Sequence, residues 1–144
     1  MVIQHVPIGQ YTRNLDEMIY ALKTELPSVS IVLITPPPID EVKLRTRNEN
    51  LGKQIITDRS NERTFEYVSA VLDVGQRNKI PVLNCFILCE GESSKREDYL
   101  VDGLHLNRRG NMKLFEQLIV LIEKNYPEFD KLQIDHPHWS KLDR

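Results

Sequence analysis

The chain has 144 residues, of which 40% are hydrophobic and 28% charged, and its formal net charge is -2. This is the composition of one soluble globular domain, and a chain of this length can bury a real core. The charge balance leaves no basic excess to neutralise a phosphate backbone, which argues against a dedicated nucleic-acid binder.

The apolar runs of the chain are short. Runs such as residues 31–34 are far below the roughly 20 residues that span a bilayer, so no membrane span is expected. Residues 1–10 hold no basic segment followed by an apolar run, so no signal peptide is expected either. We therefore expect a cytoplasmic protein.

Three segments carry apolar side chains at alternating steps of three and four, which is the spacing of an amphipathic helix. The first covers residues 8–26 and stops at Pro27, the second covers residues 62–77, and the third follows Asn107, a residue type that caps helices. Residues 40–60 are polar and weakly patterned, which predicts a loop with at most one helical turn. The apolar side chains expected to face a sheet are Ile8, Leu15, Met18, Leu22, Phe115, Leu118 and Ile122.

Two short apolar runs between these helices predict strands. Residues 29–35 are rich in β-branched side chains, which is typical of a strand buried on both faces in a parallel sheet. Residues 80–86 form the second run. The order helix, strand, helix, strand, helix predicts an α/β layer with parallel strands. Two strands are too few for a doubly wound sheet, so the chain is expected to be part of one domain.

The spacing of the cysteines and histidines does not predict a metal site or a cofactor site. Cys85 and Cys89 lie in NCFILCE, four residues apart on an expected extended run. They are too far apart there for a relaxed disulfide and are interpreted as reduced core thiols. Two thiols without a flanking histidine also make a poor zinc site. Asp135, His136 and His138 are interpreted as part of an irregular tail.

The chemistry is expected in the segment YLVDGLHLNRRGN, where Asp102 and His105 stand three residues apart just before the third helix. Histidine is the side chain most easily poised as a general base near neutral pH. A carboxylate that accepts its other ring proton fixes the tautomer, and Gly103 permits a sharp turn between the two. Taken alone, the same spacing also fits an aspartate that caps a turn beside a surface histidine.

The sequence DGLHLN, followed by a glycine and an amphipathic helix, resembles the last conserved block of the SGNH (GDSL) hydrolases. HVPIGQYTRNLDEMIYALK and IVLITPPPIDE resemble the isoamyl acetate-hydrolysing esterase branch of that family, and so do RTRNEN, FEYVSAVLDVGQRNKIPVLN and NYPEFDKLQIDHPHW. The resemblance implies a flavodoxin-like α/β/α fold. Residues 1–144 would be one partial domain, holding the last two parallel strands and three helices.

The resemblance also implies a carboxylic ester hydrolase that acts on short-chain or acetate esters through a serine acyl-enzyme. By the match, His105 is the catalytic base and Asp102 its orienting partner. The family's GDS serine, oxyanion-hole glycine and GxND asparagine belong to N-terminal blocks that this sequence lacks. None of the serines follows a strand in a Gly-Asp-Ser setting. The serines are Ser28, Ser30, Ser60, Ser69, Ser93, Ser94 and Ser140.

Two interpretations follow from these missing blocks. In the first, the chain carries the Asp/His half of an esterase site for a small ester and is inactive alone. Its open strand edge then leads to self-association or to pairing with a missing N-terminal half. In the alternative, the chain is a catalytically inactive truncated remnant or a partner-dependent fragment.

Overall fold

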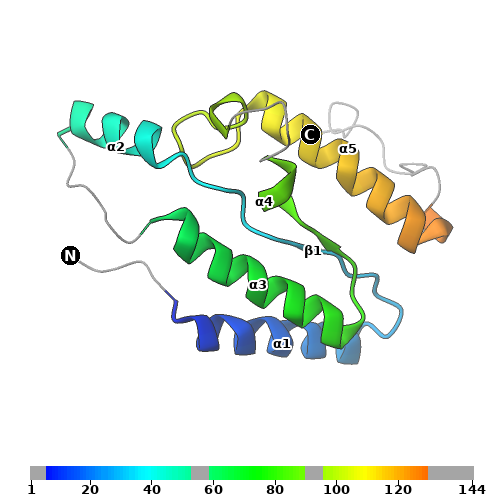
Figure 1. The fold of residues 1–144 in the computed structure, drawn as a ribbon. Helices are drawn as coiled ribbons and strands as arrows, with labels where there is room; N and C mark the ends of the chain where they lie inside the picture. Colours follow the sequence, from blue (N-terminus) through cyan, green and yellow to red (C-terminus); the bar gives the residue numbers. More distant parts are fainter. Residues whose placement is uncertain (1–5, 53–58, 90–95, 130–144) are drawn as a thin grey trace, which may run out of the picture.

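The structure is a computed structural model that describes residues 6–52, 59–89 and 96–129. Figure 1 shows the strands between two helical layers, with α1 and α3 on one side and α5 on the other. No helix in the described part of the chain is both long and apolar enough to cross a membrane. The elements are α1 (Ile8–Glu25), β1 (Leu33–Ile34), α2 (Glu41–Asn50), α3 (Asn61–Asn78), β2 (Val82–Leu83), α4 (Cys85–Leu88) and α5 (Arg108–Asn125), with 3-10 turns at Arg96–Asp98 and Pro127–Phe129.

The two strands form a parallel pair, as predicted, but each is shorter than the predicted run. The backbone N–H groups of Leu33 and Thr35 donate to the carbonyl oxygens of Pro81 and Leu83, both at 3.0 Å. Alternate residues of a strand point their backbone groups to opposite edges, so those of Ile34 face away from β2. Its side chain is 42% exposed, which corrects the prediction of a strand buried on both faces. Within the described residues β2 is the only strand that pairs with β1, and a two-stranded sheet gives its strands incomplete cover.

Helices α1 and α3 pack against each other beneath the strands. The buried cluster at this contact joins Ile19 of α1 and Val74 of α3 with Ile80, which precedes β2. Ile19 is the one buried residue of α1, whereas Met18 is 54% and Leu22 41% exposed, so the predicted inward stripe of α1 is only partly correct. The two strands are too narrow to cover the whole stripe.

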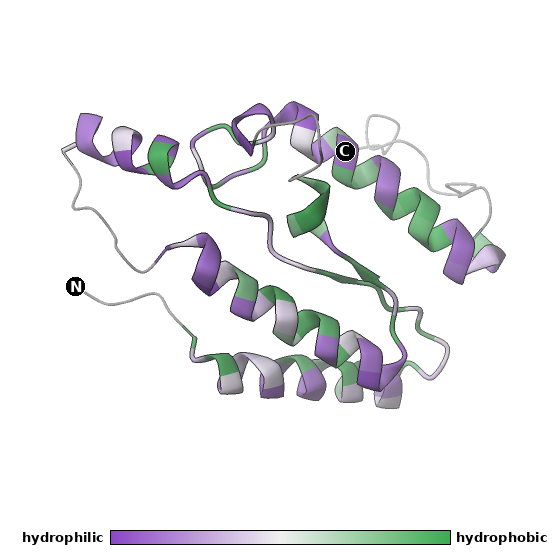
Figure 2. Cartoon of the chain, in the orientation of Figure 1, coloured by the Kyte–Doolittle hydropathy of each residue, from purple (hydrophilic) through white to green (hydrophobic). Residues whose placement is uncertain are grey.

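Helix α5 begins where Asn107 was predicted to cap it, and the Asn107 side chain accepts a hydrogen bond from the N–H of Gly110 at 2.9 Å. Figure 2 shows hydrophobic and hydrophilic residues interleaved along the helix. Leu118 and Ile122 are half-buried, whereas Phe115 is 62% exposed. The apolar face of α5 therefore extends beyond the surface that the described residues cover.

Helices α2 and α4 were not expected. α2 occupies the region predicted as a loop, and its first turn is capped by Asp40, whose carboxylate accepts from the N–H of Lys43 at 2.9 Å. α4 begins within the last two residues of the predicted second strand, runs beyond it, and is capped by Asn84.

The cysteines therefore lie on a helical turn, so their predicted extended geometry is wrong. Both thiols are free and buried, as predicted for core thiols. A hydrogen bond to Cys89, together with burial, raises the pKa of the Cys85 thiol, and the unreactive protonated form is favoured.

Candidate active site

The loop between Arg96–Asp98 and α5 is closed by its own backbone. Leu100 and Leu106 form an antiparallel bridge, and the N–H of Val101 donates to the carbonyl of His105 at 2.8 Å. Inside this closure Gly103 has a φ of +85°, in the left-handed region that glycine adopts without strain. The sharp turn predicted at Gly103 is therefore present.

The turn brings Asp102 and His105 together. Oδ2 of Asp102 lies 2.9 Å from Nδ1 of His105, while Oδ1 accepts the backbone N–H groups of His105 at 2.9 Å and Leu104 at 3.1 Å. The aspartate side chain is 13% exposed and the histidine side chain 70%. When Nδ1 donates to this carboxylate, Nε2 carries the lone pair on the exposed side of the ring.

The charge on Asp102 is fixed by its hydrogen bonds. Desolvation acts to raise its pKa, but it is outweighed by the bonds from the His105 backbone, the His105 ring and the Leu104 backbone, which lower the pKa to about 2. The carboxylate is therefore ionised at neutral pH, and it stabilises an imidazolium as one forms.

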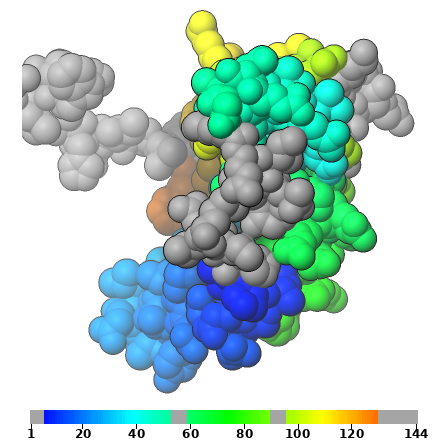
Figure 3. Space-filling model, turned by 90° about the vertical axis from the view of Figure 1, so that its left-hand side faces the viewer, coloured from blue at the N-terminus to red at the C-terminus, as the bar shows by residue number. Residues whose placement is uncertain are grey.

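Helix α2 holds this loop from the other side. The N–H of Asp40 donates to the Gly103 carbonyl at 2.9 Å, and Nζ of Lys43 donates to the Leu100 carbonyl at 2.8 Å. Nε of Arg47 lies 3.7 Å from Oδ2 of Asp102. Sequence reasoning missed these contacts because α2 was predicted as a loop, although Asp40 is a residue type that caps helices. Figure 3 shows α2 and α1 at opposite ends of one face of the molecule.

The site lies beyond the carboxyl ends of the strands, where ligands of open α/β sheets bind. The chain that leaves β1 runs through Thr35 to Asp40. Asp40 contacts the loop between Arg96–Asp98 and α5 that carries Asp102 and His105, called the Asp–His loop below. Thr35 is 1% exposed, and its hydroxyl donates to Oδ1 of Asn84 at 3.2 Å and accepts the N–H of Phe86 at 3.3 Å. These bonds tie together the segments that follow the two strands.

The serines of the described chain have other settings. The Ser60 hydroxyl caps α3 by accepting the N–H of Arg63 at 3.2 Å, and Ser69 lies half-buried within that helix. Ser28 and Ser30 precede β1, at the end opposite to the site. No group of three or more metal-ligating side chains occurs in the described segments. Lying outside those segments are Ser93, Ser94, Asp135, His136, His138 and Ser140.

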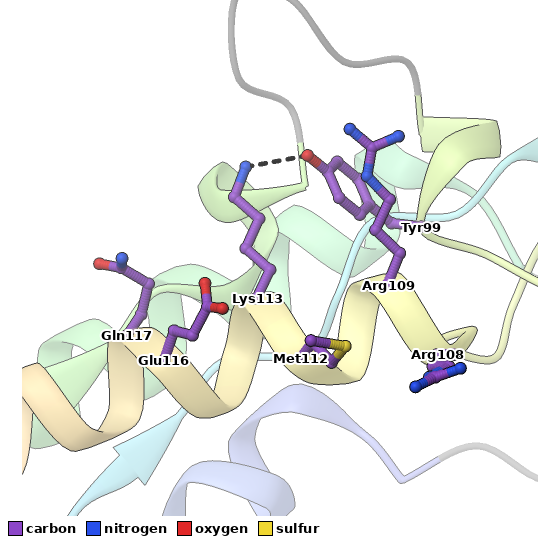
Figure 4. Close-up of a pocket in the computed structure, with 7 residues that line it drawn as sticks. All are labelled: Tyr99, Arg108, Arg109, Met112, Lys113, Glu116 and Gln117. Carbon is purple, nitrogen blue, oxygen red and sulfur yellow. Dashed lines mark hydrogen bonds between the residues drawn. The ribbon is translucent and has the colours of Figure 1, made fainter.

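An open hollow of about 480 Å³ lies along α5 (Figure 4). In this hollow, Nζ of Lys113 lies 4.7 Å and the guanidinium carbon of Arg109 lies 5.3 Å from the centre of the Tyr99 ring. Nζ of Lys113 also donates a hydrogen bond to the Tyr99 hydroxyl at 3.1 Å. Neither Asp102 nor His105 lines this hollow, so it is separate from the site. Its lining residues are Tyr99, Arg108, Arg109, Met112, Lys113, Glu116 and Gln117.

Comparison with known proteins finds no matching family model, but it does find related sequences. A GDSL esterase/lipase of Arabidopsis thaliana is 31% identical over 143 residues, which cover 97% of this chain and 59% of the relative. The isoamyl acetate-hydrolyzing esterase 1 homolog of Homo sapiens is 35% identical over 140 residues, covering 96% of this chain and 54% of the relative.

The fold is similar to that of a solved esterase domain, from the ORF1 protein of the zebrafish ZfL2-1 retrotransposon. The TM-score is 0.62 at 17% sequence identity, over 83% of this chain and 61% of that one. At this identity the likeness establishes the fold alone. The chain is thus related in sequence to GDSL (SGNH) esterases over nearly its whole length, is similar in fold to an esterase domain, and spans about half the length, 54–59%, of these two curated relatives.

Proposed function

We propose that the chain supplies the acid–base half of a carboxylic ester hydrolase that works through a serine acyl-enzyme. The observation that supports this proposal is the 2.9 Å contact between Asp102 and Nδ1 of His105, with the ring otherwise open to solvent. In such a site Nε2 takes the proton of the serine hydroxyl during attack on the ester carbonyl. It then returns that proton to the leaving alcohol, while Asp102 stabilises the imidazolium between the two steps.

The serine and the oxyanion donors come, in this proposal, from a segment equivalent to the part of the relatives that the chain does not match. That part is between 41% and 46% of the length of the two relatives, since the chain covers 59% and 54% of them. The proposed substrate is a small ester, because a relative is named for isoamyl acetate hydrolysis. The free thiols of Cys85 and Cys89 fit a reducing compartment such as the cytoplasm.

The same segment is the proposed partner of the apolar surface that this chain leaves exposed. The outward edge of β1 carries the 42% exposed Ile34, and a strand added there would bond its free backbone groups. Large apolar side chains are also exposed on the helices of both layers, and a wider sheet needs cover from both. They are Met18, Leu22, Leu26, Met112, Phe115 and Val120.

Reconstitution tests this proposal. The chain is joined, or mixed in trans, with the unmatched part of the human homologue, and hydrolysis of p-nitrophenyl acetate is followed. We expect the chain alone to give only the slow background of a free imidazole and the completed protein to give enzymatic turnover. His105→Ala should abolish that turnover, and Asp102→Asn should lower kcat by about 10⁴-fold. Asp73→Asn, on the exposed side of α3, is the matched carboxylate control and should leave the rate unchanged.

The alternative is that the chain is a catalytically inactive remnant or a partner-dependent fragment. It predicts that the completed protein elutes as one folded species and still fails to hydrolyse the ester. Ordinary turnover by the isolated chain would contradict both hypotheses, because it would require a nucleophile within these residues.

A further inference from the structure

The carboxylate of Asp102 contacts a second cationic side chain besides the histidine. Its Oδ1 is occupied by two backbone N–H groups of its own loop. Its Oδ2 lies 2.9 Å from Nδ1 of His105 and 3.7 Å from Nε of Arg47. The imidazole and the guanidinium therefore share one oxygen atom.

Arg47 reaches this oxygen from an anchored helix. It stands one turn beyond Lys43, whose Nζ donates to the Leu100 carbonyl at 2.8 Å, so the two cations lie on the same side of α2. Leu44 and Asn48, each 8% exposed, form the buried side of this helix. The Arg47 side chain is 43% exposed, so it remains hydrated while it contacts Asp102.

We infer that Arg47 is a positioning residue for the Asp102–His105 pair, one that holds Oδ2 in place and shares its negative charge. An aspartate alone would favour the imidazolium, whereas a base must be neutral before it accepts a proton. With Arg47 beside it, the carboxylate still orients the imidazole ring but stabilises the protonated form of that ring less. This role rests on the proposed function of His105, although the contact itself does not. Among the described residues, other charged groups beside the loop include Asp40 and Lys43 of the α2 region, Asp98 before the loop and Arg108 at the start of α5.

The test follows the His105 ring directly, by NMR titration of the chain labelled at its imidazoles. In Arg47→Gln, the His105 ring signals should titrate at a higher pH than in wild type, because the cation beside Oδ2 of Asp102 is removed. Arg45→Gln makes the same charge change on an exposed position of α2 and should move the midpoint much less. Arg47→Lys should retain part of the wild-type behaviour, since it keeps the charge without the planar fork.

Equal midpoints for Arg47→Gln and Arg45→Gln would overturn the inference. If Arg47→Gln does not fold, Arg47→Ala is compared with Arg45→Ala, and equal midpoints there would overturn it too. Because the titration uses no substrate, its outcome is independent of whether the completed protein hydrolyses esters. In an active completed enzyme, Arg47→Gln should also shift the acid limb of the pH profile of kcat/KM upward.

Discussion

Gly103 is the position at which the smallest change should do the most damage to the Asp–His loop. A Cβ atom there would lie 2.6 Å from the Asp40 carbonyl oxygen and 2.6 Å from the Leu44 nitrogen, whereas ordinary contact begins at 3.4 Å. Both neighbours are backbone atoms, so no rotamer change relieves the overlap. In Gly103→Ala the loop must move away from α2, which breaks the hydrogen bond from the Asp40 N–H to the Gly103 carbonyl.

The chain offers a matched control at Gly52, which also has a positive φ, +60°, but where an added Cβ would have no described atom within 4 Å. Gly52→Ala should cost only the left-handed strain, about 1 kcal/mol of unfolding free energy. Gly103→Ala adds overpacking and a lost hydrogen bond, for a total of about 3 to 4 kcal/mol. Urea denaturation followed by circular dichroism measures both. Equal losses in the two variants would refute the idea that α2 and the loop are in rigid contact.

Three further changes test other parts of the structure. Gly75→Ala should destabilise the chain by about 2 kcal/mol because its Cβ would overlap Val82, and Val82→Ala should recover part of the loss; strictly additive effects would contradict this contact. Thr35→Val should cost about 1 to 2 kcal/mol in a thermal melt, since the N–H of Phe86 loses its acceptor, and an unchanged melt would show that this bond is dispensable. The pKa of Asp102 falls from 3.8 to about 2 on folding, so the ionised carboxylate adds about 2 kcal/mol to the free energy of unfolding above pH 4 and loses this effect towards pH 2. The difference in unfolding free energy between wild type and Asp102→Asn should therefore shrink as the pH falls over that range. A constant difference would refute this role of the carboxylate.

The three long helices were predictable because their apolar side chains recur with helical period, and Asn107 marked the start of the last one. α2 was not, because Leu44 is its only buried apolar residue and periodicity has nothing else to detect. α4 was predicted as strand because an apolar run of this length fits a buried helical turn equally well, and only the capping residue Asn84 distinguished the two. The exposure of the apolar stripes depends on how much sheet is present, which no local pattern encodes.

Within the site, the contact between Asp102 and His105 was predictable because it is local: three residues and one glycine turn determine it. Arg47 was not predictable, because its approach to Asp102 depends on the way α2 packs against the loop. Tertiary contacts of this kind leave no spacing in the sequence. The catalytic roles of the two residues remain a prediction that the reconstitution experiment tests.

The Asp–His loop is closed by its own backbone, and this has a consequence for how a histidine base of this kind can be transferred from one protein to another. The bridge between Leu100 and Leu106, the left-handed glycine and the cap at Asn107 all lie within one short stretch of chain. The orientation of the imidazole is thus encoded by a contiguous cassette that ends in a helix start. Such a cassette can be grafted onto another α/β scaffold as a unit, and the recipient must supply a strand end in front of it, a nucleophile across from it and a helix that contacts it as α2 does here.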